Sequence, residues 1–234
     1  MSLDPTTTSF RRGGARAVTA ALLLAVVWGV AFGTRVLPFF PTIVAGGVLT
    51  GLAGVWVRRG TRGWHAGEPA RRRFPDLRLT SAQAVLATGV GVAHFVVGHL
   101  LFAAGEVVLP ALTSTAASVY VRAGSLPLWA AIVLGGVITA PLEEVFWRGA
   151  VQPLTSSFVE DRLPRVARLP GGPLLGATLV YTLFHVATGQ VALVAAALLG
   201  GFVWGWLLQR TGSVGATMLA HGLWTSLMLA FPPV

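Results

Sequence analysis

Long runs of apolar residues with few charged positions recur along the whole chain. Most of them approach or exceed the roughly 20 residues that cross the hydrocarbon core of a bilayer as an α-helix. The predicted spans cover residues 15–33, 37–57, 82–105, 126–152, 173–187, 189–209 and 213–231. The pattern therefore predicts an all-α, polytopic membrane bundle of about seven spans, in which residues 1–234 form a single membrane domain.

Composition agrees with this pattern. Apolar residues make up 54% of the chain and charged residues 11%, with a mean hydropathy of +0.74. An average soluble domain has about 25% charged residues. The chain has no cysteine, which excludes disulfides and thiolate metal sites. The spans leave no room for a sizeable soluble domain, so we expect the lipid bilayer to be the main partner.

The basic residues are distributed unevenly between the predicted spans. The net charge of +9 comes from Arg, which is concentrated in cytoplasmic segments of membrane proteins. With the N-terminus inside, the outer segments hold only Arg35 and Arg122, and Arg148 lies within a span. The inner segments then hold Arg11, Arg12, Arg16, Arg58, Arg59, Arg62, Arg71, Arg72, Arg73, Arg78, Arg162, Arg165, Arg168 and Arg210. This bias predicts a cytoplasmic N-terminus, an outer C-terminus and an odd number of spans.

The same bias explains the basic pI of about 11.7 without nucleic-acid binding, which we do not expect. Heavy use of Arg, Ala, Gly and Val is typical of a GC-rich bacterial genome, so the expected location is a bacterial cell membrane. A cleaved signal peptide is an alternative for the first run. The length of that run, Trp28 and the lack of a clear small-x-small site favour a span.

Two further features concern packing. Segment 106–124 contains Glu106, Pro110 and several hydroxyl residues, and it predicts an outer loop with a short interfacial helix. The pairs Gly47 with Gly51 and Gly201 with Gly205 have the spacing of close helix contacts.

The fourth predicted span carries three charged residues, which are costly in a membrane and indicate function. Glu144 and Arg148 are four residues apart and share a helix face, whereas Glu143 lies about 100° around the helix. We therefore expect Glu144 to pair with Arg148 and Glu143 to remain free. Pro141 lacks an N–H and predicts a kink just before the two carboxylates. An ion pair that only fixes helix packing is the alternative.

Two later spans each carry one histidine. His185 has Tyr181 one turn earlier on its face, and His221 has Thr225 one turn later. A lone intramembrane histidine is often a hydrogen-bonded packing group. At about 1.5 Å per residue, however, both histidines lie mid-bilayer and Glu143 lies somewhat nearer the inner face. Kinks and tilt could bring these groups together.

Such a cluster is suited to hydrolysis. A carboxylate can accept a proton from water, and a histidine can share that water or donate to the leaving amine. A second histidine with a hydroxyl neighbour can hydrogen-bond the developing oxyanion. Alternatively, one Glu and two His could hold zinc with a fourth position open for water.

The residues of the three spans resemble those of the CAAX prenyl proteases of the Rce1 type and their bacterial relatives, also called the CPBP or Abi family. The family motif Glu-Glu-x-x-x-Arg matches Glu143, Glu144 and Arg148. Its Phe-x-x-x-His motif matches His185, with Tyr181 in place of Phe, and its His-x-x-x-Asn motif matches His221, with Thr225 in place of Asn. The resemblance covers about residues 126–231, which form the motif-bearing core.

The resemblance implies an intramembrane endopeptidase with an active site open towards the cytosol. The implied substrate is a membrane-associated or lipid-anchored protein or peptide. Glu143 and His185 would activate water, and His221 with residue 225 would stabilise the oxyanion. No cofactor is expected under the glutamate mechanism now favoured for the family, and zinc is the alternative. The Thr225 substitution leaves a hydroxyl, shorter than an amide, for the oxyanion role.

Other readings of the sequence remain. A non-catalytic scaffold or bacteriocin self-immunity protein of the same fold is the main alternative, and a transporter or proton relay is a third. The two halves of the chain show no repeat that would support a transporter. Less promising polar residues are His94 and His99, five apart in the third span, Glu106 at the outer rim, and His65 and Glu68 in the basic loop.

Overall fold

The structure is a computed structural model, and it describes residues 5–34, 36–61 and 74–234. The described residues are almost entirely helical, and those of the predicted outer segment 106–124 include a short helix, as expected. The helices are α1 (Pro5–Gly33), α2 (Phe39–Gly60), α3 (Ser81–Val108), α4 (Ala111–Ala123), α5 (Leu128–Ala131), η2 (Ile132–Thr139), α6 (Ala140–Phe146), η3 (Trp147–Val151), α7 (Gln152–Arg162), α8 (Pro164–Ala167), α9 (Gly172–Val186), α10 (Val191–Thr211) and α11 (Val214–Ala230).

Five of these helical segments are long and apolar enough to cross a membrane. They cover Phe10–Gly33, Phe39–Gly60, Ser81–Val108, Leu128–Arg162 and Val191–Thr211. Helices α9 and α11 are apolar but shorter. The protein is therefore a polytopic helical membrane bundle, as the apolar runs predict. The fourth segment runs on to Arg162, beyond its predicted end at residue 152, because the polar helix α7 continues it without a break.

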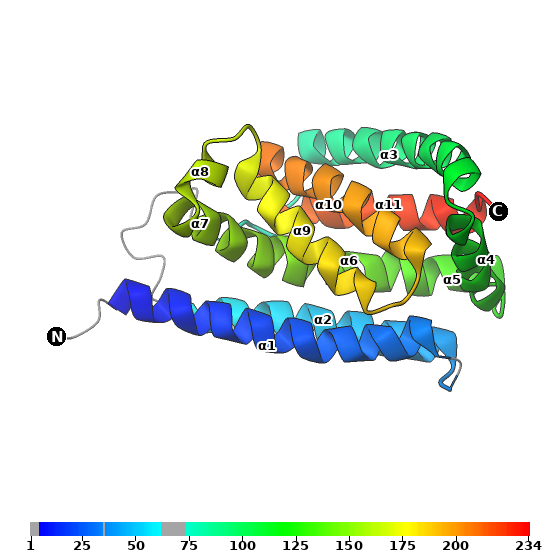
Figure 1. The fold of residues 1–234 in the computed structure, drawn as a ribbon, viewed down its shortest axis with the longest axis horizontal. Helices are drawn as coiled ribbons and strands as arrows, with labels where there is room; N and C mark the ends of the chain where they lie inside the picture. The colour runs from blue at the N-terminus through cyan, green and yellow to red at the C-terminus, as the bar shows by residue number, and fades with distance from the viewer. Residues whose placement is uncertain (1–4, 35, 62–73) are drawn as a thin grey trace.

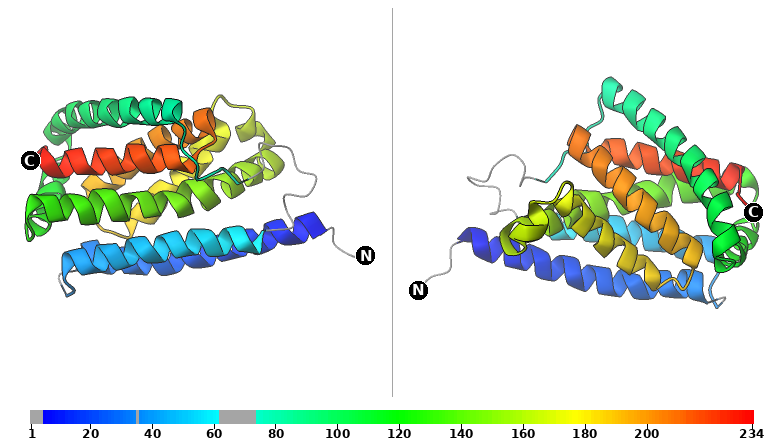
Figure 2. Two further views of the ribbon diagram at one scale, coloured as in Figure 1. Left: turned by 180° about the vertical axis from the view of Figure 1, so that it is seen from behind. Right: turned by 45° about the horizontal axis from the view of Figure 1, so that its top comes forward.

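The α1–α2 hairpin forms one layer, and the remaining helices lie on one side of it (Figures 1 and 2). Small residues let the layers approach closely. A Cβ atom on Gly47 would lie 3.0 Å from Thr139, and one on Gly51 would lie 3.1 Å from Leu142. Gly201 and Gly205 face α9 in the same way. Both glycine pairs are thus helix contacts, as predicted.

Two ends of the bundle can be distinguished. The first turns of α1, the last turns of α2 and α10, and helices α7 and α8 lie at one end, which we call the arginine-rich end (Figure 1). Helix α4 and the C-terminus lie at the opposite end (Figure 1). The basic segments that the structure describes thus share one end, as the predicted topology requires. Arg35, Arg62, Arg71, Arg72 and Arg73 lie outside the described residues.

Helix α4 is tied to the last turn of α1 at the opposite end. Arg122 donates hydrogen bonds to the carbonyl oxygens of Ala31 and Phe32, each at 2.8 Å. The amide of Gln190, before α10, also donates to the Phe32 carbonyl, at 3.0 Å. The last carbonyls of a helix lack partners within it, so these donors stabilise the helix end. They fix α1, α4 and the α9–α10 connection around one region of the bundle.

Candidate active site

The helix that carries the two carboxylates is irregular on both sides of them. The π-helical stretch Ile132–Thr139 precedes α6, and a second one, Trp147–Val151, follows it. Pro141 cannot donate a backbone hydrogen bond, which accounts for a disturbance just before it, where a kink was predicted. Thr139 donates its hydroxyl to the Leu134 carbonyl at 2.7 Å. Short π-helical stretches inside α-helices occur frequently at functional sites.

Glu144 lies at the centre of a buried polar network. Its Oε2 is 3.4 Å from Nε of Arg148, and the two side chains are 0% and 2% exposed. This is the predicted ion pair, and it is confirmed. The Arg148 guanidinium also lies over the Tyr181 ring, 4.4 Å from its centroid. Its Nη2 donates to the Gly200 carbonyl at 3.3 Å, so Arg148 joins α9 and α10 to the carboxylate helix.

The second partner of Glu144 is His221, a contact that the sequence did not predict. Nδ1 of His221 lies 2.9 Å from Oε1 of Glu144. A carboxylate oxygen accepts, so Nδ1 is the donor. The contact needs α11 close to the carboxylate helix, and glycines allow it: a Cβ on Gly222 would lie 2.6 Å from the Gly136 carbonyl oxygen. The Trp204 ring stacks on His221 at a centroid distance of 3.7 Å.

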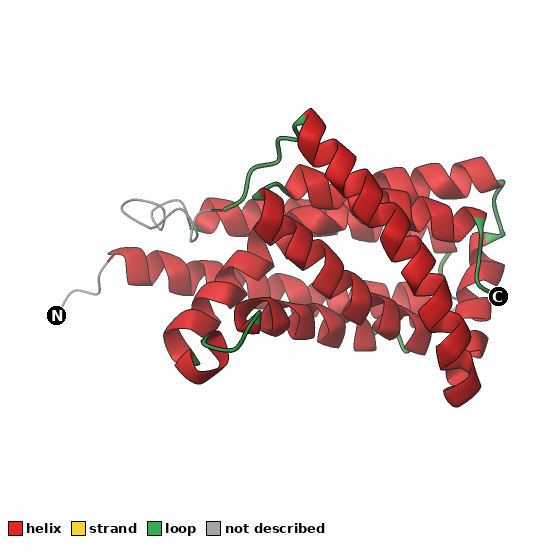
Figure 3. Cartoon of the chain, turned by 90° about the horizontal axis from the view of Figure 1, so that it is seen from above, coloured by secondary structure: helices red, strands yellow, loops and turns green. Residues whose placement is uncertain are grey.

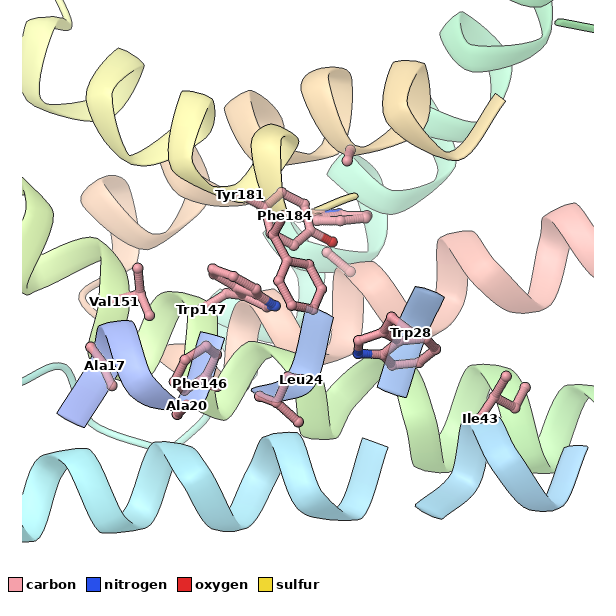
Figure 4. Packing of buried hydrophobic residues seen from close by; sticks show 14 of the residues in the cluster. Ala17, Ala20, Leu24, Trp28, Ile43, Phe146, Trp147, Val151, Tyr181 and Phe184 are labelled. Atoms are coloured by element: carbon pink, nitrogen blue, oxygen red, sulfur yellow. The ribbon is translucent and has the colours of Figure 1, made fainter. Parts of the chain in front are cut away.

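His185 is oriented by its own helix. Its Nδ1 lies 2.9 Å from the Tyr181 carbonyl oxygen, which can only accept, so Nδ1 carries the proton. In the neutral ring Nε2 is then an acceptor, a tautomer fixed by the backbone. The Tyr181 ring meets the His185 ring edge-on at 4.5 Å. Figure 4 shows the neighbouring aromatic core, where Trp147 packs against Phe184 with centroids 4.7 Å apart.

Four of the six predicted site residues meet at one cavity of about 180 Å³. Glu143, His185, His221 and Thr225 all line it. Glu143 is 9% exposed and makes no hydrogen bond or ion pair with a described residue, whereas Glu144 is fully enclosed. The two carboxylates therefore differ as predicted. Glu144 forms an ion pair, whereas Glu143 faces the cavity and is not paired with a described residue.

Aromatic residues from α1, α2 and α4 form another part of the cavity wall, and no sequence pattern predicts it. Trp28 and Phe32 from α1, Phe39 and Phe40 from α2, and Tyr120 from α4 line this part. These residues read as ordinary apolar positions because nothing in their spacing distinguishes a cavity wall from a helix contact. The α1–α2 hairpin and α4 thus complete a cavity whose ionisable residues Glu143, His185 and His221 come from α6, α9 and α11.

The less promising polar residues within the described part of the chain do not line this cavity. His94 is buried, and its ring stacks on Trp224 at 5.1 Å. His99 contacts the carbonyl oxygens of Phe95 and Phe231. Glu106 accepts a hydrogen bond from Thr113 at 3.3 Å, near the opposite end of the bundle. His65 and Glu68 lie outside the described residues.

The zinc alternative requires a set of converging ligands. Within residues 5–34, 36–61 and 74–234, no three His, Cys, Asp or Glu side chains are grouped so that they could hold a metal ion. Glu144 holds Nδ1 of His221, and the Tyr181 carbonyl holds Nδ1 of His185, an arrangement that zinc-ligating histidines share, so the grouping of the side chains decides the question. Glu143, His185 and His221 share a cavity without forming a ligand set, so the residues present do not fit a zinc site.

Comparison with known protein families finds a match in the segment that contains these residues. Residues 124–227 match the sequence model of the family described as type II CAAX prenyl endopeptidase Rce1-like. The match begins after α4 and ends within α11, so it includes the carboxylate helix and both histidines but not the α1–α2 hairpin. No curated protein and no solved structure matches the chain.

Proposed function

Because residues 124–227 form an Rce1-like type II CAAX prenyl endopeptidase domain, we propose that this membrane protein is an intramembrane endopeptidase. It hydrolyses a peptide bond in a membrane-associated or lipid-anchored protein or peptide. One observation carries the proposal: the free Glu143 carboxylate shares a cavity with two oriented histidines. A role in packing alone would leave Glu143 without a purpose, since Glu144 already pairs with Arg148.

The water-activating step uses Glu143 and His185. Water bound in the cavity donates one proton to the Glu143 carboxylate and a second hydrogen bond to Nε2 of His185. Its oxygen then attacks the carbonyl carbon of the scissile peptide bond. Glu143 subsequently transfers its proton to the nitrogen of the leaving amine, which completes hydrolysis. The Tyr181 carbonyl supports this role by holding the His185 ring in the tautomer that accepts at Nε2.

The oxyanion that forms in this step faces His221 and Thr225. Glu144 holds Nδ1 of His221, so donation from Nε2 requires the imidazolium form of the ring. The negative charge of Glu144 beside the ring offsets that positive charge. The Thr225 hydroxyl, one helical turn further on, supplies the second donor. Donors of this kind act strongly because they are fixed before the charge develops.

A comparison of Glu143→Gln with the wild-type protein tests the proposal. Both are reconstituted into vesicles with a panel of membrane-anchored peptides, and cleavage is followed by mass spectrometry. Gln keeps the shape of the side chain and removes the base, so turnover should fall by about 10²–10⁴-fold with unchanged thermal unfolding. His185→Ala should also lose turnover. Glu106→Gln, a carboxylate change away from the cavity, should keep the wild-type rate.

The same assay separates the alternatives. Chelators should leave the wild-type rate unchanged, and a chelator-sensitive rate restored by zinc would support the metal mechanism instead. Cleavage at the wild-type rate by a folded Glu143→Gln protein would overturn the role of Glu143. A wild-type protein that binds these peptides without cleaving any of them would favour the scaffold function.

A further inference from the structure

A second, larger cavity lies beside the catalytic one. It has a volume of about 480 Å³ and is enclosed by α3, α4, α9, α10 and α11. Its lining contains no charged side chain, and the polar groups are limited to Tyr120, Thr178 and the Trp224 indole. Cavities of about 300–1,000 Å³ are typical of sites that hold small molecules. The size is therefore that of a binding site, and the lining is that of an apolar one.

The two cavities share a wall. The residues that line both are Val119, Tyr120, Leu193, Ala196, Trp224 and Met228. Trp224 directly precedes Thr225, and its ring centroid is 6.3 Å from that of His221. Whatever occupies the second cavity therefore packs against the back of residues that shape the catalytic one.

The second cavity also borders the lipid-facing surface. Leu101, Leu198 and Phe202 contribute to its lining, and they are 53%, 49% and 50% exposed. They belong to α3 and α10, two helices long enough to span the membrane. Within the hydrocarbon region, exposed apolar residues of a spanning helix contact lipid chains. Figure 3, seen from above, shows α3 crossing the bundle at an angle to the helices beside it.

The chemistry of the lining restricts the occupant. Each water molecule requires two or more polar partners, and the polar side chains of this lining are Tyr120, Thr178 and Trp224, so water cannot fill most of a volume of about 480 Å³. An extended peptide would leave its backbone N–H and C=O groups without partners, at a cost of several kcal/mol each. A hydrocarbon chain has no such groups, and the bilayer supplies one at high local concentration. We propose that this cavity binds an acyl chain of a bilayer lipid, which supports the Tyr120–Trp224 wall of the catalytic cavity. Binding requires no hydrolysis, so it does not depend on the proposed peptidase activity.

Ala195 allows the cavity to be filled without disturbing the site. It lines the second cavity but not the catalytic one, and it is exposed, so a larger side chain meets no tight packing. Ala192 lines only the second cavity as well. Ala93 on α3 is an exposed alanine that lines neither cavity and provides the matched control.

Photolabelling tests the inference. The full-length protein is reconstituted into phosphatidylcholine vesicles in which a fraction of the lipid carries a diazirine in one acyl chain. Labelled residues are then mapped by mass spectrometry. In the wild-type protein we expect label on Tyr120 and Trp224, which are half-buried behind the cavity mouth. Ala195→Phe should reduce that label about tenfold, the result of a binding loss of about 1.4 kcal/mol.

Control variants distinguish lipid in the second cavity from lipid at other places on the protein. Ala93→Phe should leave the labelling of the wall unchanged, and the inactive Glu143→Gln protein should label like the wild type. Ala192→Phe provides a second filled cavity if Ala195→Phe is poorly folded. Label confined to the exposed faces of α3 and α10 would overturn the proposal. Loss of the wall label on adding a lipid-anchored peptide would also overturn it, since the cavity would then belong to the anchor of the substrate.

Discussion

At the scale of single residues, the two adjacent carboxylates have separate surroundings. Glu144 contacts Arg148 and His221, and all three side chains are buried. Glu143 faces the cavity. Helix geometry is enough to predict this separation, because neighbours on a helix differ by about 100° and only Glu144 lies four residues from Arg148. The network thus pairs Glu144 and leaves Glu143 facing the cavity.

Loss of one member of this network should destabilise the protein. Removing one partner of a buried ion pair leaves an uncompensated charge and costs about 3–5 kcal/mol. Glu144→Gln and Arg148→Met should each lower the thermal stability and the folded yield, measured by unfolding in detergent. The double variant should recover part of the loss, since no charge is then left alone. Wild-type stability in both single variants would contradict the structural role of the pair.

Thr225 supports a second prediction at this scale. If its hydroxyl donates to the oxyanion, Thr225→Val should lower kcat by on the order of 10²–10³-fold without a change in folding. Thr225→Asn places the family residue at this position and should remain active. Thr182→Val removes a hydroxyl that bonds within α9, to the Thr178 carbonyl, and should keep the wild-type kcat. An unchanged kcat in Thr225→Val would mean that His221 acts without it.

The contact between Glu144 and His221 shows where sequence reasoning at the residue scale stops. The two residues are 77 positions apart on different helices. Periodicity assigns each to a span and gives its depth, but it does not determine which rotation of α11 faces α6. That rotation depends on the close approach of Gly136 and Gly222, whose facing surfaces become visible only in the folded chain.

At the scale of elements, the long apolar runs are sufficient to predict the main helices and the approximate ends of most of them. Hydropathy does not predict the π-helical stretches on either side of α6, because a window average carries no information about the hydrogen-bond pattern. Hydropathy also does not distinguish the apolar residues of a cavity wall from those that face lipid. Both irregular stretches flank the carboxylates, so the least predictable part of the fold carries the proposed chemistry.

The packing of α2 against α6 can be tested with glycine variants. A Cβ on Gly54 would lie 2.6 Å from the Val145 carbonyl oxygen and 2.8 Å from the Phe146 nitrogen, both rigid backbone atoms. Gly54→Ala should therefore force the helices apart and destabilise the fold by about 1–3 kcal/mol. Gly89→Ala on α3, where nothing lies within 4 Å, should be neutral or stabilising by up to about 1 kcal/mol. Thermal unfolding of both variants in detergent decides this, and equal stabilities would refute the packing argument.

At the scale of the whole molecule, the position of the cavity and the distribution of arginine lead to an orientation of the site that differs from the one the family resemblance implies. The cavity extends from Glu143 towards the last turns of α1 and α11, at the end opposite the arginine-rich one. If the arginine-rich end faces the cytoplasm, the cavity extends towards the outer surface. The family resemblance instead implies a site open towards the cytosol. The membrane topology determines which of these two expectations fails.

Reporter fusions provide the measurement. The described basic segments lie at one end of the bundle, so we expect that end, and with it the N-terminus, to remain in the cytoplasm. A fusion at residue 70, between α2 and α3, should report a cytoplasmic location, and a fusion at the C-terminus should report an outer one. Both reporters on the same side would refute the seven-span topology. An outer reporter at residue 70 with a cytoplasmic C-terminus would invert the bundle, direct the cavity lined by Glu143 towards the cytosol, and overturn the orientation predicted from arginine.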